Sequence, residues 1–221
     1  MSNLPANITS LVAGINKAIA TAHIQNVEGK HYLKMVKGVW VYGKDGIEVE
    51  EGSHWAVNIN SLARGFIAWP ADGSGGRPLG EEMRSIYQDP ITEGELPNLA
   101  NGSWASQVGF EVVCLNGEDK GTECIFKAST KGAESAFNDL LTSIGKYFNG
   151  SFDPDKTVPV ISFETESYEH PKKSYGTIIK PVFKIVRWES ASASLDTVEE
   201  VEDEPEVEVK EEAPRRRRRT A

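Results

Sequence analysis

The sequence predicts an α+β fold that is mostly β-stranded, with one compact domain between an N-terminal helix and a charged tail. Three observations predict it. Apolar and polar residues alternate over 107–115 and again over 122–128, a helical apolar stripe follows them, and the composition turns acidic after residue 190. With 221 residues the chain is long enough for one sizeable core.

Residues 1–29 are predicted to hold an amphipathic helix from Pro5 to His23. Its apolar positions follow the helical period: Ile8, Leu11, Val12, Ile15, Ala18, Ile19 and Ala22. This stripe fits either a helix packed on its own domain or a helix that docks on a partner. The N-terminus lacks the features of a secretory signal, and no apolar run approaches the length of a membrane span.

The next region is predicted to be β-rich. Residues 31–42 contain many β-formers, Gly43–Gly46 is a turn signal, and 47–50 alternates behind it, so we expect a hairpin. Two further short strands are expected at 55–59 and 65–69. Residues 79–103 have few strand signals and several prolines, which predicts an extended excursion that is either functional or plain surface loop.

The second half carries clearer signals. In the hairpin 107–115/122–128, Val108, Phe110, Val112 and Cys114 share one face. The helix that follows is predicted to begin after a Ser129 or Thr130 cap and to end at Gly150 as a left-handed cap. Strands are expected at 158–165 and 176–188. Residues 30–189 thus predict an OB-like Greek-key barrel, with one helix between its third and fourth strands.

Residues 190–221 are predicted to be a disordered acidic tail that ends in the arginine run Arg215–Arg219. The tail from Asp196 has net charge −4 and the rest of the chain −5, within a total of −9. A net-negative domain does not fit a generic duplex binder, which has a broad basic face. Any nucleic-acid contact is therefore expected to be local.

No catalytic, metal or cofactor motif occurs in the sequence. The phosphate loop, the nucleophile elbow and the HExxH pair are all missing, and no histidine stands at zinc-ligand spacing from another ligand. Cys114 and Cys124 are expected to be reduced core thiols, with a disulfide as the alternative. The prediction is a protein that is not an enzyme and needs no cofactor.

Two segments combine basic and aromatic residues as single-strand binders do. Lys30–Lys44 holds four lysines and no acidic residue, and Tyr168–Trp188 holds five basic residues and one acidic residue. Basic side chains follow phosphates, and flat side chains stack on exposed bases. The predicted nucleic-acid-binding residues are Lys34, Lys37, Trp40, Tyr42, Lys127, Lys131, Tyr168, Lys172, Lys173, Tyr175, Lys180 and Lys184.

The chain resembles phage single-stranded-DNA-binding proteins that have an OB fold and a charged C-terminal tail. The resemblance rests on the element order, on the tail beyond Glu189, and on the stretches GVWVYG (Gly38–Gly43) and YEHPKKSYGTIIKPVFKIVRW (Tyr168–Trp188). It implies non-catalytic coating of single-stranded DNA during phage or bacterial replication or recombination, in the cytoplasm of a bacterial host. The tail would contact replication proteins or compete for the basic groove.

Two other functions stay open. The chain could be a protein-interaction or virion structural module, with the N-terminal helix and residues 79–103 as contact surfaces. A metal-dependent nuclease is the other alternative, with Glu164 and Glu166 as its carboxylates. A homo-oligomer is compatible with either binding function.

Overall fold

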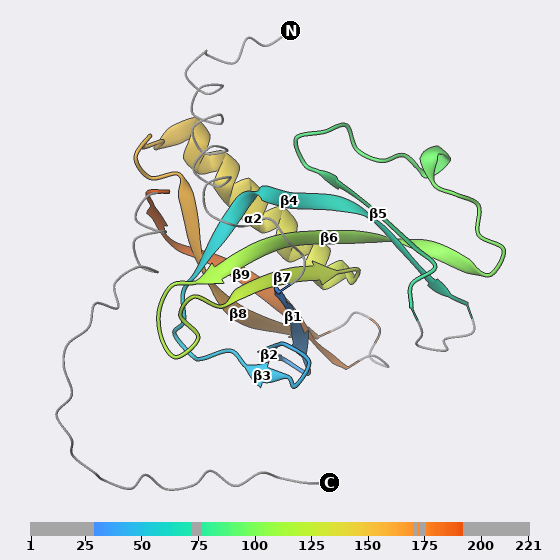
Figure 1. Ribbon diagram of the computed structural model, residues 1–221, viewed down its shortest axis with the longest axis horizontal. Helices are drawn as coiled ribbons and strands as arrows, with labels where there is room; N and C mark the ends of the chain where they lie inside the picture. Colours follow the sequence, from blue (N-terminus) through green and yellow to red (C-terminus); the bar gives the residue numbers. More distant parts are fainter. Residues whose placement is uncertain (1–28, 72–76, 170–171, 173–175, 192–221) are drawn as a thin grey trace, which may run out of the picture.

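The computed structural model describes residues 29–71, 77–169, 172 and 176–191 (Figure 1). The elements are β1 (His31–Val36), β2 (Val39–Tyr42), β3 (Ile47–Glu48), β4 (Trp55–Pro70), β5 (Gly80–Ser85), the 3₁₀ turn η1 (Glu93–Glu95), β6 (Gly102–Cys114), β7 (Glu123–Ala128), α2 (Lys131–Gly150), β8 (Val158–Glu169) and β9 (Thr177–Glu189). The mostly β-stranded prediction is confirmed. The predicted N-terminal helix and the tail from residue 192 lie outside the described residues.

One sheet contains all nine strands, in the order β3-β2-β1-β7-β6-β4-β8-β9, with β5 paired to β4. After the helix the chain returns to place β8 beside β4, not beside β7. Within the described residues no ladder joins β3 to β9, so the sheet is open. Figure 1 shows β4, β5 and β6 extending together past the rest of the sheet, and we call this extension the arm.

The hairpin β6–β7 confirms the prediction of alternating faces. Phe110 pairs with Phe126 and Val112 with Cys124, and all four side chains are buried. Cross-strand partners share a face, so the pairs form one side of the core. Cys114 and Cys124 are both buried and free, as expected of core thiols.

The helix α2 begins as predicted and ends differently. The Thr130 side chain accepts a hydrogen bond from the backbone N–H of Ala133, which satisfies one of the donors left open at a helix start. The predicted left-handed cap at Gly150 is wrong. Gly150 is the last helical residue, and the cap is Ser151 at φ −116°, whose N–H donates to the Tyr147 carbonyl.

Three strand predictions change in the structure. Residues 31–42 are themselves a hairpin, because Lys37 (φ 51°) and Gly38 (φ 85°) form a two-residue turn with two left-handed residues. The two strands predicted at 55–59 and 65–69 are one strand, β4, with a register shift between Asn58 and Ala63. The predicted excursion at 79–103 begins with β5, which pairs with β4.

A single core joins the sheet to α2. It takes buried side chains from seven strands and the helix, among them Leu33, Trp55, Phe110, Phe137 and Ile161. On β9, Pro181 and Phe183 are buried. Proline lacks a backbone donor, and it is tolerated here because β9 has a single neighbour, β8.

Candidate nucleic-acid interface

The two basic and aromatic segments of the sequence meet in the fold. The tip of the β1–β2 hairpin lies against β9, where a Cβ built on Gly38 would be 3.0 Å from Cδ1 of Ile179. A hydrogen bond of 3.1 Å from Trp40 Nε1 to the Glu164 carbonyl joins β2 to β8. Residues more than a hundred positions apart in the sequence therefore lie side by side in the fold.

The exposed part of β1 carries the combination that single strands require. Tyr32 is 56% exposed, and Lys34 is exposed on the same face, opposite the buried Leu33. Lys37 is exposed at the turn. Within the part of the chain that the structure describes, neither Lys34 nor Lys37 has an ion-pair partner, so both ammonium groups are open to a phosphate.

Tyr168 adds a second exposed ring at the end of β8, where it pairs with Ile178 and is 43% exposed. Lys172 is an exposed residue of the same connection between β8 and β9. The predicted site residues Lys173 and Tyr175 belong to this connection and lie outside the described residues.

Trp40 and Tyr42 do not belong to this surface. Each is 6% exposed and packs in the core. Trp40 lies 4.8 Å from the ring of Phe163, and the Tyr42 hydroxyl donates to Asp119 Oδ1 at 2.6 Å. Their ring faces are covered by protein and leave no room for a base. We therefore leave both out of the interface, a correction of the sequence-based list.

The other four predicted lysines all have carboxylate partners. Each ammonium lies within salt-bridge distance of one carboxylate: Lys127 with Glu81 (2.9 Å), Lys131 with Glu134 (2.8 Å), Lys180 with Glu166 (2.9 Å) and Lys184 with Glu164 (3.2 Å). The hydrogen bond with Glu166 raises the pKa of Lys180, and the one with Lys131 lowers the pKa of Glu134. A phosphate at these lysines must compete with a carboxylate already in place.

The same pairs bear on the nuclease alternative. Glu164 and Glu166 share a face of β8, as the sequence predicted, and each faces a lysine of β9. In the described ranges no group of three or more potential ligands among histidine, cysteine, aspartate and glutamate is close enough to hold a metal ion. These two carboxylates are structural partners of lysines in this fold.

The buried thiols are poor nucleophiles. Burial raises the pKa of Cys114, and it raises the pKa of Cys124 to about 12. The thiolate is the reactive form, so both groups stay protonated and unreactive near neutral pH.

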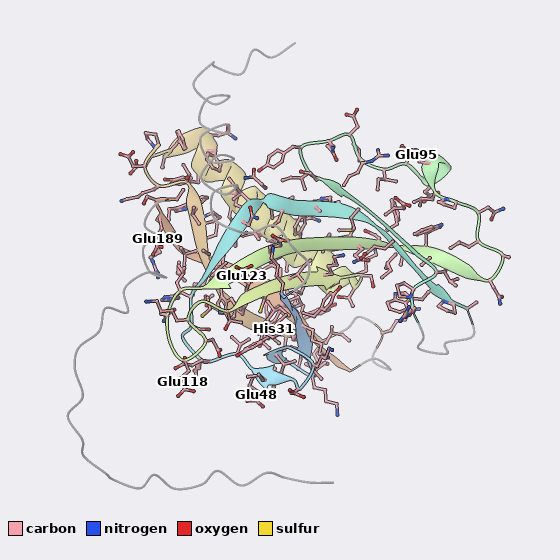
Figure 2. All side chains as sticks on the ribbon, in the orientation of Figure 1. His31, Glu48, Glu95, Glu118, Glu123 and Glu189 are labelled. Carbon is pink, nitrogen blue, oxygen red and sulfur yellow. The ribbon has the colours of Figure 1, made fainter. Side chains whose placement is uncertain are left out.

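Sequence reasoning missed Tyr32 as a site residue. The signal was present, because strict alternation around the apolar Leu33 turns Tyr32 and Lys34 to the opposite face. The predicted contact surface at 79–103 contributes β5 to the arm, where Leu79 and Trp69 are exposed. Figure 2 shows Glu95 at the arm, well away from His31 on β1, so the arm and the β1–β9 surface are separate places.

Among the described residues no helix is both long and apolar enough to cross a membrane. Comparison of the chain with protein-family models, with curated proteins and with solved structures found no match.

Proposed function

We propose that this protein binds single-stranded DNA without catalysis, in phage or bacterial replication or recombination within the host cytoplasm. One observation carries the proposal. The turn of the β1–β2 hairpin, which carries Lys37, packs on Ile179 of β9, next to the end of β8 that bears Tyr168, and Tyr32 and Lys34 are exposed on the same hairpin. Aromatic rings and unpaired lysines on one surface suit stacked bases and phosphates.

The strand order supports an OB-like reading of the domain. Strands β4, β6 and β7 follow one another, and β8 lies beside β4 after the helix, which is a Greek-key order. With β9 next to β8, these five strands have the helix between the third and the fourth, as in a partly open OB barrel. On this reading, β1–β3 and β5 are additions to the barrel.

The charge pattern predicts a modest electrostatic contribution. Few lysines on this surface lack carboxylate partners, so we expect about two or three neutralised phosphates. Each contributes a slope of ~0.7 in log K against log salt, so the total slope should be roughly 1.5 to 2. Stacking on Tyr32 and Tyr168 should add about 1–3 kcal/mol for each base.

The test is fluorescence anisotropy of a labelled oligo-dT at low and moderate salt, with the full chain and with a chain ending at Ser190. Lys34→Glu with Lys37→Glu should weaken binding by more than ten-fold, on the order of two lost phosphate contacts. Lys44→Glu is the matched control, because Lys44 is also exposed but lies on the turn that leads away to β3. Equal effects of both changes, or no binding at low salt, would remove the proposal.

The second candidate is a protein-interaction or virion structural module. The observation that favours it is the arm, where Trp69 and the neighbouring Leu79 are 44% and 46% exposed. Exposed apolar clusters mark interaction sites more often than single residues do. Size-exclusion chromatography with light scattering decides: a defined oligomer that Trp69→Ser dissociates supports this function, and a monomer at all concentrations counts against it.

A further inference from the structure

A groove of about 780 Å³ lies between the C-terminal half of α2 and the strands β4 and β5. Its floor is apolar and is lined by Ile59, Leu62, Ile86, Leu141, Ile144 and Phe148. The two arginines at its rim already have partners, since Arg64 bonds to Asn138 and Arg84 pairs with Glu95. Asn138 is a neutral amide, so Arg64 keeps a charge that no carboxylate pairs with among the described residues. The groove thus offers an apolar floor with one cation, Arg64, beside it.

Gly145 indicates what shape of occupant this groove accepts. It lies within α2, lines the groove, and has nothing within 4 Å of the position that a Cβ would occupy. Glycine is one of the poorest residues for a helix interior, and it is used where another backbone must come close. A glycine at this position leaves room for a second helix to approach the backbone of α2.

The start of the described chain is anchored to β4 and β6, behind the strand that forms the groove floor. Lys30 Nζ is 2.8 Å from Glu111 Oε2, and the same carboxylate oxygen accepts a hydrogen bond of 3.3 Å from Asn58. The Glu111 N–H donates to the Ser61 hydroxyl at 2.8 Å. Asn58 and Glu111 alternate along their strands with the core residues Ile59 and Phe110, so they lie on the face of the sheet that points away from the core and α2. The chain that precedes Lys30 therefore leaves from the other face of the same stretch of β4 that supplies Ile59 and Leu62 to the groove floor.

We propose that residues 5–23 form the amphipathic helix that their sequence predicts, and that this helix covers the groove of its own chain. A helix of that length spans about 28 Å, and the residues that link it to Gly29 reach up to roughly 20 Å when extended. Residues 1–28 contain Lys17 and Glu28 as their only charged side chains besides histidine, which suits burial on an apolar floor. The strongly acidic tail suits that floor less well.

The test uses the full chain with one charge placed on or off the apolar stripe. Leu11→Asp lies on the stripe, and the adjacent Ser10→Asp lies on the opposite face of the predicted helix. Under the proposal, Leu11→Asp speeds amide exchange over 141–149 and 86–91 by roughly ten-fold or more, and it raises binding of the dye ANS. Ser10→Asp does neither. Near-ultraviolet circular dichroism checks that the core of each variant is intact.

Gly145→Leu gives an independent readout. If a helix covers the groove, the leucine side chain should displace that helix and raise amide exchange and ANS binding, as Leu11→Asp does. If the groove is uncovered, the leucine should only fill part of it and reduce ANS binding. Equal behaviour of the two N-terminal variants would overturn the proposal. If removing the tail, in a chain that ends at Ala191, exposes the groove, then the tail is what covers it and the proposal is wrong. A third outcome is that amide protection of the groove increases with protein concentration while light scattering shows a dimer. The groove would then be covered by a second copy of the chain, which would also overturn the proposal.

Discussion

Changing Tyr42 to phenylalanine should destabilise the protein by an amount that shrinks at high pH. The Tyr42 hydroxyl donates a hydrogen bond of 2.6 Å to Asp119 Oδ1, and both residues are buried. Besides Tyr42, the Asp119 carboxylate accepts only a longer bond of 3.3 Å from the Glu50 N–H within the described residues. Tyr42→Phe would therefore leave a buried carboxylate short of a donor.

The size of the effect follows from the charge of the acceptor. A hydrogen bond to a charged group contributes about 1.5–3 kcal/mol, so we expect the free energy of unfolding to fall by about 2 kcal/mol at pH 8. For a chain of this length that corresponds to a melting temperature lower by roughly 4–8 °C. Tyr168→Phe is the control, because Tyr168 is 43% exposed and should change stability little.

The pH dependence has a definite sign. Burial, followed by the bond to Asp119, raises the pKa of Tyr42 from 10.0 to about 12. A tyrosine whose pKa is higher in the folded protein than in the unfolded protein stabilises the fold. That contribution is complete at a pH below the unfolded-state pKa, and it is lost as the pH rises towards and through the folded-state pKa. At pH 11 the wild type should have lost about 1.4 kcal/mol of that contribution, so its advantage over Tyr42→Phe should shrink by the same amount.

Urea unfolding followed by tryptophan fluorescence measures the free energy of both proteins at each pH. Other tyrosines and lysines titrate in the same range in both proteins, so the difference between them isolates Tyr42. A gap that stays constant from pH 8 to pH 11 would refute the reasoning, because it would mean that Tyr42 ionises with an ordinary pKa. A gap near zero at pH 8 would refute the assigned hydrogen bond.

Three further outcomes are expected. Gly65→Ala should separate β5 from β4, because the new Cβ would lie 1.8 Å from the Glu82 carbonyl oxygen. Hydrogen exchange should then show faster exchange of the amides of 80–85 and unchanged protection of β7. Glu164→Gln with Glu166→Gln should free the two lysines of β9 and tighten oligo-dT binding several-fold at low salt, and an unchanged affinity would exclude this face from the interface. Trp188→Ala should lower the free energy of unfolding by at least about 1 kcal/mol, because its ring stacks on Tyr147 at 3.8 Å; denaturant unfolding that shows no loss would contradict this.

The best-predicted parts of the fold are those whose signals are local. The β6–β7 hairpin alternates strictly, and α2 has a cap and a continuous stripe, so both follow from neighbouring residues. The strand β5 could not be foreseen, because its sequence GEEMRS contains few β-formers. Pairing with β4 holds it in place, and pairing is a tertiary interaction.

The candidate site was misjudged where a turn decides which way a ring points. Leu33 pairs with Tyr42 and Met35 with Trp40, and cross-strand partners share a face. Because the turn at Lys37 and Gly38 has two residues, both aromatic rings fall on the core side with Leu33. Composition showed that aromatic residues were present, but the side to which they point depends on the register.

The ion pairs of β9 were hidden for a related reason. Lys180 faces Glu166 only because β8 and β9 pair in one particular register. A short turn of known type sets the register of the two strands that it joins, but the connection between β8 and β9 is too long for that. The sequence therefore does not show which lysine faces which glutamate.

The edges of the sheet affect how this protein behaves at high concentration. An uncovered edge strand can recruit the edge of another molecule and so begin aggregation. At one end of the strand order β3 is only two residues long, and at the other end β9 carries Pro181 among charged residues such as Lys180 and Lys184. The third edge strand, β5, pairs with β4 alone and carries Glu81, Glu82 and Arg84. Short length, proline and lysine are the means by which native sheets resist such recruitment. Pro181→Val should therefore leave the fold intact while making the protein more prone to form fibrils, a property separate from anything it binds.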